Sequence, residues 1–117
     1  RIVKMHHAAR FGEREALGQA YLVLDWAYVE SGRVDLAVYS ARALRIYEEL
    51  DDLSRQASAL NNLGGIAYYD GRWRDALDLY ERGRDANLRT GDDVEVPTSN
   101  VLALLREAAD RERGVPC

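Results

Sequence analysis

The sequence contains one cysteine, two prolines and a single lysine among its 117 residues. Because Cys117 has no partner cysteine in the chain, neither an intrachain disulfide nor a cysteine metal site can form. The formal net charge is −4, and the arginines alternate with acids. Nucleic acid is therefore not an expected partner, since its phosphates need a basic surface.

No apolar run reaches the roughly 18 residues of a membrane span, and no signal peptide is visible. We expect a cytoplasmic protein without membrane contact, and, because the first Met is Met5, part of a longer chain.

What the sequence does contain favours helices. Alanine, leucine, arginine and glutamate recur throughout, and all four are good helix formers. Residues 20–37 also align with residues 59–76. The matched pairs all differ by 39 positions: Ala20 and Ala59, Leu24 and Leu63, Gly32 and Gly71, Arg33 and Arg72, Ala37 and Ala76. The sequence therefore predicts an all-α fold that contains a repeat.

Each repeat has the pattern of a helical hairpin. In the first unit, apolar residues spaced three and four apart predict a buried stripe made of Leu17, Ala20, Tyr21, Leu24, Ala27 and Tyr28. Gly32 and Gly71 are expected to end the first helix of each hairpin, because glycine readily adopts the left-handed conformation. Small residues such as Gly64 and Gly83 would let the paired helices approach closely.

The repeat also predicts where the units divide. We expect one domain over residues 1–117, with a partial preceding hairpin at 1–12, repeat 1 at 14–50, repeat 2 at 54–90 and an incomplete or capping repeat at 94–113. Asp51-Asp52 and Asp92-Asp93 lie between units, where aspartate can cap the following helix. Pro97 suits the first position of a new helix.

The second unit resembles the tetratricopeptide repeat family. The similarity rests on LNNLGGIAYYDGRWRDALDLYERG, in which the matching positions are Leu63, Gly64, Tyr68, Gly71, Trp73, Ala76, Tyr80 and Gly83. The first unit departs from the pattern, since Asp25 replaces the glycine and Ala41 replaces the aromatic. The resemblance covers residues 14 to 112 and implies a right-handed superhelix of about five to six antiparallel helices. The unit of 39 to 40 residues is longer than the usual one of about 34.

A second resemblance concerns the parent protein. VLDWAYVESGR and LNNLGGIAYYDGRW are similar to repeat regions of large actinobacterial signalling proteins, namely adenylate or guanylate cyclases and multidomain transcriptional regulators. This resemblance implies a regulatory or dimerisation segment of such a protein, with the catalytic or DNA-binding domain outside this chain.

Residue types that often perform chemistry are present but not suitably arranged. His6 and His7 are adjacent, so on a helix they point about 100° apart and cannot share one ion. The aspartate pairs lack the spacing of a calcium loop. Cys117 has no base nearby. We therefore expect no enzyme activity, no metal and no cofactor.

A peptide-binding groove is the better candidate site. In a repeat array the first helices of the hairpins line the concave side, and residues outside the packing stripe face it. The resemblance to the tetratricopeptide repeat implies that these candidates are Gln19, Leu22, Trp26, Val29, Ser58, Asn61, Asn62, Gly65, Tyr68 and Tyr69. Exposed aromatic rings and amides suit a bound peptide. For Trp26 and Tyr68, a place in the core between units is the alternative, and for Trp26 it is equally favoured.

The expected function is therefore protein binding without chemistry, as a scaffold or signalling module. The partner would be a protein, a peptide or another domain of the same chain, and the open repeat ends would allow a homo-oligomer. Some relatives grip a terminal carboxylate with basic groove residues and asparagines. Asn62 would fit, but Leu22 and Trp26 occupy the basic positions, so no such clamp is predicted.

Overall fold

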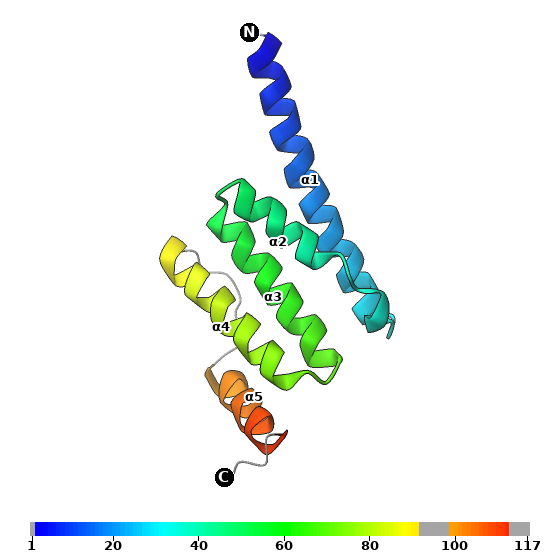
Figure 1. Cartoon of the computed structure of the whole chain (residues 1–117), viewed down its shortest axis with the longest axis vertical. Coiled ribbons are helices and arrows are strands. Elements are labelled where there is room, and N and C mark those ends of the chain that lie inside the picture. Colours follow the sequence, from blue (N-terminus) through cyan, green and yellow to red (C-terminus); the bar gives the residue numbers. More distant parts are fainter. Residues whose placement is uncertain (1, 92–98, 113–117) are drawn as a thin grey trace.

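All the regular structure that is described is helical. The computed structural model describes residues 2–91 and 99–112, and the side chains of 12–91 and 105–111. These ranges contain α1 (Ile2–Glu30), the 3₁₀ turn η1 (Val34–Leu36), α2 (Ser40–Glu49), α3 (Leu53–Tyr69), α4 (Trp73–Thr90) and α5 (Ser99–Glu112). The all-α prediction is confirmed (Figure 1). Within the same ranges, no helix has both the length and the apolar character needed to cross a bilayer.

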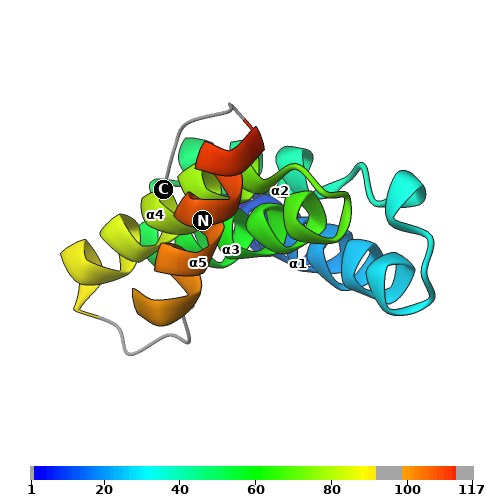
Figure 2. The ribbon, with the colours of Figure 1, turned by 90° about the horizontal axis from the view of Figure 1, so that it is seen from below.

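The helices follow one another across the molecule in chain order. Contacts join α1 to α2, α2 to α3, α3 to α4, and α4 to α5, and α1 also touches α3. α1 lies at one side and α4 at the other, with α3 between them (Figures 1 and 2). The chain thus forms two consecutive helical hairpins, α1–α2 and α3–α4, followed by α5.

The predicted bends at Gly32 and Gly71 are confirmed. Both glycines have a positive φ, 77° and 79°. In each case the next residue's amide donates to the carbonyl five positions back, at 2.7 Å in the first hairpin and 2.9 Å in the second. This pair of features ends a helix with a left-handed residue and satisfies its last carbonyls. The same backbone conformation therefore ends the first helix of both hairpins, at the two glycines that the repeat aligns.

The turn between the hairpins is also confirmed. Asp51 takes φ 54° and follows the end of α2, and the Asp52 carboxylate accepts a hydrogen bond of 3.0 Å from the Arg55 amide. Asp52 therefore caps α3 as expected. The corresponding Asp92-Asp93 pair and Pro97 lie outside the described residues.

One predicted boundary is wrong. The repeat predicts a partial hairpin at residues 1–12 and a new unit from residue 14, but α1 runs without interruption from Ile2 to Glu30 (Figure 1). Gly12 is helical, and an added Cβ would meet nothing within 4 Å. A lone glycine inside a helix weakens it by only about 1 kcal/mol, so the helix continues through this position.

The buried face of α1 also differs from the predicted stripe. Leu17 and Leu24 are 45% and 38% exposed, and Ala20 and Ala27 are exposed too, whereas Tyr21 and Tyr28 are half-buried. The buried residues are Gly18, Leu22, Asp25 and Val29, which are also spaced three and four apart. A glycine and an aspartate occupy half of this face, so hydrophobicity alone indicates the wrong stripe.

Close approach of the paired helices depends on small residues, as predicted for Gly64. A Cβ added at Gly64 would lie 2.7 Å from the Tyr80 ring, and one at Gly18 would lie 2.7 Å from the Tyr47 ring. Each hairpin therefore packs a tyrosine ring directly on a glycine backbone. The buried residues around these contacts include Ala43, Ala59, Ala67 and Ala76, all at 0% exposure.

The two hairpins differ at one position of the repeat. Asp25 corresponds to Gly64, and residues 34–39 correspond to 73–78 in the first turns of α4. In α4 these residues are helical, but in the first unit they form η1 and an irregular segment, so α2 starts only at Ser40. At this later start of α2, the buried carboxylate of Asp25 accepts hydrogen bonds from the amides of Tyr39 (3.0 Å) and Ser40 (2.5 Å). It caps α2 from a different helix.

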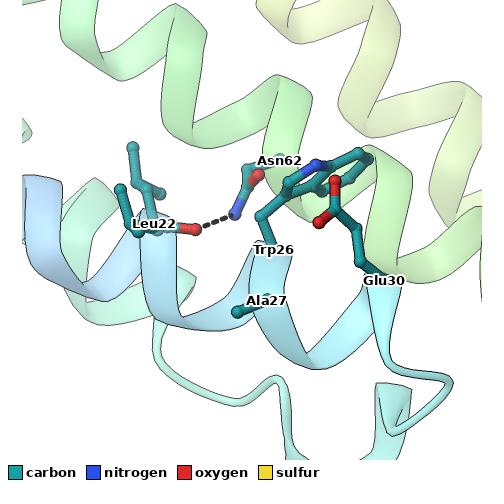
Figure 3. Close-up of a pocket in the computed structure, with 6 residues that line it drawn as sticks. Leu22, Trp26, Ala27, Glu30 and Asn62 are labelled. Atoms are coloured by element: carbon teal, nitrogen blue, oxygen red, sulfur yellow. Dashed lines mark hydrogen bonds between the residues drawn. The ribbon is translucent and has the colours of Figure 1, made fainter.

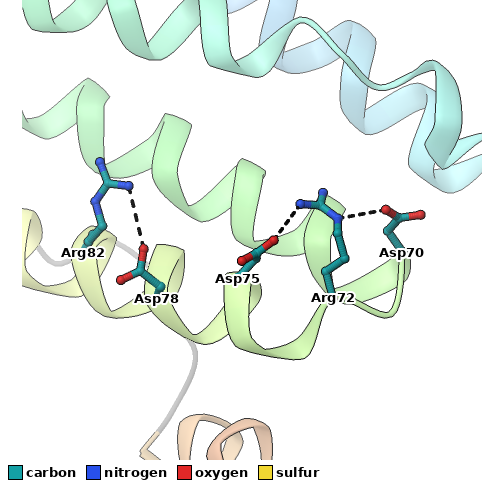
Figure 4. Close-up of polar contacts among 5 residues, drawn as sticks. All are labelled: Asp70, Arg72, Asp75, Asp78 and Arg82. Carbon is teal, nitrogen blue, oxygen red and sulfur yellow. Dashed lines mark hydrogen bonds and ion pairs between the residues drawn. The ribbon is translucent and has the colours of Figure 1, made fainter. Parts of the chain in front are cut away.

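The α3–α4 turn has its own surface ion pairs. Arg72 donates to Asp70 at 2.8 Å and to Asp75 at 3.1 Å, and Asp78 and Arg82 pair one turn later (Figure 4). The hydrogen bond to Asp70 raises the pKa of Arg72. These side chains are all about half exposed or more, so each pair adds little to stability.

Candidate functional site

The candidate site is a hollow between α1 and α3. Its volume is about 360 Å³, and five of its six lining residues come from α1. The sixth comes from α3 (Figure 3). We call this site the hollow; its lining residues are Leu22, Val23, Trp26, Ala27, Glu30 and Asn62.

The spacing on α1 explains the shape of the lining. Val23, Ala27 and Glu30 follow one another at intervals of four and three, so they share one side of the helix. Trp26 lies between them and is 40% exposed, and Val23 is 60% exposed. Ala27 and Glu30 are exposed as well, so this strip of α1 stays in reach of a ligand.

Asn62 is held in the wall of the hollow by two hydrogen bonds. Its amide nitrogen donates to the Leu22 carbonyl at 3.3 Å and to the Ser40 hydroxyl at 2.7 Å. That hydroxyl in turn donates to the buried Asp25 carboxylate at 2.6 Å. A chain of hydrogen bonds therefore runs from the capped end of α2, through Ser40, to the hollow, and it restricts how the Asn62 side chain can turn.

A row of aromatic rings extends away from the hollow. Trp26 meets Tyr69 with ring centroids 6.5 Å apart, Tyr69 meets Tyr68 at 5.3 Å, and Tyr68 meets Trp73 at 5.3 Å, all edge-to-face. Tyr68 is 40% exposed and Tyr69 is 61% exposed. We call these four residues the aromatic row. Mutual edge-to-face contacts hold the rings in place while one side of each stays open to solvent.

The structure separates eight of the ten predicted groove residues into three groups. Leu22, Trp26 and Asn62 come together in the hollow. Tyr68 and Tyr69 belong to the adjoining row. Gln19 and Ser58 are exposed and Asn61 is half-buried, but none of these three lines the hollow.

Three of the predicted groove positions are mainly core. Leu22 is 8% exposed and Val29 is 9% exposed, and both pack in the apolar core. Gly65 is buried under Trp26, where an added Cβ would lie 3.2 Å from the indole. The prediction that these three residues form the groove surface is wrong. α1 is rotated relative to the predicted stripe, so Leu22 and Val29 turn inward, and Gly65 on α3 is covered by the Trp26 indole. Leu22 still lines the hollow.

Val23, Ala27 and Glu30 line the hollow but are not among the predicted groove residues. The predicted packing stripe includes Ala27, and the other two residues belong to neither predicted set. Their signal was the spacing of three and four with Trp26 at its centre, shifted by one residue from the predicted face. Glu30 is the one charged side chain in the lining, and the predicted groove residues do not include this negative charge.

Among the described residues, no three His, Cys, Asp or Glu side chains gather closely enough to hold a metal ion. The side chains of His6, His7 and Cys117 lie outside the described residues. No family model, curated protein or solved structure matches this chain.

Proposed function

We propose that this chain is a helical-repeat interaction module of tetratricopeptide type that binds a peptide or an extended protein segment in the hollow and along the aromatic row. The observation that supports this proposal is Trp26. Its large apolar side chain is 40% exposed in the wall of a hollow of about 360 Å³, and its ring contacts Tyr69, the next member of the aromatic row. Partly exposed aromatic residues in a concave setting are typical anchors of protein interfaces.

The size of the hollow favours one or two ligand side chains over a whole folded domain. Small-ligand pockets start at about 300 Å³, so the volume suits a single anchor residue. The aromatic row then offers a further surface for the neighbouring residues of a peptide. Glu30 and Asn62 supply polar contacts at the wall. The partner in this proposal is another protein or another segment of a longer parent chain.

Selection from a random peptide library tests the proposal. The chain is immobilised, displayed 12-residue peptides are enriched, and affinities of the synthetic winners are measured by calorimetry. Trp26→Ala should weaken the winners by at least about tenfold, as expected for an aromatic anchor. Leu36→Ala is a matched control because Leu36 is also 40% exposed but does not line the hollow.

The two variants separate binding from folding. Trp26→Ala should lose more stability than Leu36→Ala, because the indole also covers Gly65 and contacts Tyr69. Thermal melting therefore sets an assay temperature at which both variants are folded. Failure to enrich any peptide, or equal losses of affinity in the two variants, would overturn the proposed function.

A further inference from the structure

The hydrogen bonds behind Asn62 have only one consistent direction. The Asp25 carboxylate can only accept, so the Ser40 hydroxyl must donate to it. The Ser40 oxygen then accepts from Asn62, and the Leu22 carbonyl can accept but not donate. Both amide hydrogens of Asn62 are thereby used. What remains for a ligand is the Asn62 oxygen, an acceptor.

Figure 3 agrees with this orientation. The amide nitrogen of Asn62 faces the Leu22 carbonyl, and its oxygen lies on the opposite side, toward Trp26. The orientation does not depend on choosing between two similar atoms, because an oxygen facing the Leu22 carbonyl would place two acceptors together. The wall of the hollow thus presents an acceptor whose direction is set from the buried carboxylate.

Glu30 adds a second acceptor and a negative charge. No described residue forms a hydrogen bond or an ion pair with its side chain. Figure 3 shows its carboxylate beside the indole of Trp26. None of the six lining residues is a cation, so the formal charge of the lining is negative, as is the formal net charge of −4. An anionic ligand group would be repelled here.

From these observations we infer that the hollow recognises a cationic side chain, arginine or lysine, within the bound peptide. The methylene groups of that side chain pack against Trp26, Val23 and Ala27, and its charged end donates hydrogen bonds to Glu30 and to the Asn62 oxygen. The face of Trp26 adds attraction for the cation. This inference rests on the proposed function and specifies its ligand.

The peptide selection also tests this inference. The enriched peptides should share a position occupied by arginine or lysine next to apolar residues. Replacing that arginine by citrulline, a neutral analogue of the same shape, should weaken binding by about ten- to a hundredfold, since hydrogen bonds to charged groups are the strong ones. For a lysine winner, norleucine is the neutral replacement. In Glu30→Gln the loss on neutralisation should fall below about threefold.

Glu48→Gln is the matched control. It removes the same charge from an exposed residue on α2 that does not line the hollow, so the full preference for the cation should persist. Enriched peptides that depend on Trp26 but share no basic position, or that tolerate neutralisation, would overturn this inference and leave the proposed function standing. An unchanged preference in Glu30→Gln would also overturn it. Failure to enrich any peptide would overturn both.

Discussion

The cap that Asp25 places on α2 predicts a large loss of stability in Asp25→Ala. The side chain is 0% exposed, and its carboxylate accepts from two backbone amides and from the Ser40 hydroxyl. All these donors lie within 3.0 Å of the nearer carboxylate oxygen. Alanine provides no acceptor, so the first turn of α2 loses its cap and the interior keeps donors without partners.

The size of the effect follows from three contributions. Removing a helix cap costs about 1 kcal/mol. The remaining donors, left unpaired in the interior, cost about 1 kcal/mol each. Removing a buried charge returns part of this energy, because the carboxylate no longer has to be desolvated. We therefore expect the free energy of unfolding to fall by about 2 to 3 kcal/mol.

Urea denaturation followed by far-ultraviolet circular dichroism at pH 7 measures this change. Asp35→Ala is the control, since Asp35 is exposed in η1 and its removal should cost no more than about 0.5 kcal/mol. Asp25→Asn should fall between the wild type and Asp25→Ala, because the amide retains one acceptor oxygen. A loss in Asp25→Ala no larger than in Asp35→Ala would refute the claim that this carboxylate holds the start of α2.

Three further predictions concern packing, titration and hydrogen-bond direction. Gly64→Ala should lower the free energy of unfolding by about 1 to 3 kcal/mol, because the added Cβ would lie 2.7 Å from the Tyr80 ring. Gly12→Ala, where the added Cβ meets nothing, should raise it by up to about 1 kcal/mol. Thermal melting of the two variants measures both changes. Burial raises the pKa of Tyr47 above 10.0, so its contribution to stability is fully present below pH 10 and is lost as the pH rises through the raised value. Urea midpoints at pH 9 and 11 should therefore drop less in Tyr47→Phe than in the wild type. Asn62→Asp should cost about 1 to 3 kcal/mol in urea, because it replaces a donor by an acceptor facing two acceptors, while Gln19→Glu on the exposed surface should change little.

The helix ends were the part of the fold that the sequence predicted best. Gly32 and Gly71 each produce a local conformation that needs no information from the rest of the chain, and both adopt the expected positive φ. Asp52 likewise caps α3 through a residue three positions away. Such signals involve residues close together in the sequence, so the local conformation that they predict does not depend on the tertiary packing.

The buried face of α1 could not be predicted in the same way. Leu17 and Leu24 are apolar but exposed, whereas Asp25 is charged but fully buried. A hydrophobic pattern predicts the burial of each residue from its own side chain alone. It contains no information about the start of α2, whose hydrogen-bond donors offset the cost of burying the carboxylate. For the same reason the candidate site was shifted by one residue, so Trp26 and Asn62 were found and Glu30 was missed.

The departure of the first unit from the repeat connects the fold to the site. Gly64 in the second unit leaves room for a tyrosine ring, and α4 begins two residues after Gly71. Asp25 in the first unit instead needs hydrogen-bond donors, and it obtains them by holding the start of α2 at Ser40. Ser40 is thereby placed where its oxygen accepts from Asn62, which fixes the amide oxygen toward the hollow. A glycine at position 25, as in the second unit, would remove the carboxylate that accepts from Ser40 and so gives this series of hydrogen bonds its direction. The irregular residue of the repeat, which weakens the sequence match, is therefore the one that sets the polarity of the candidate binding site.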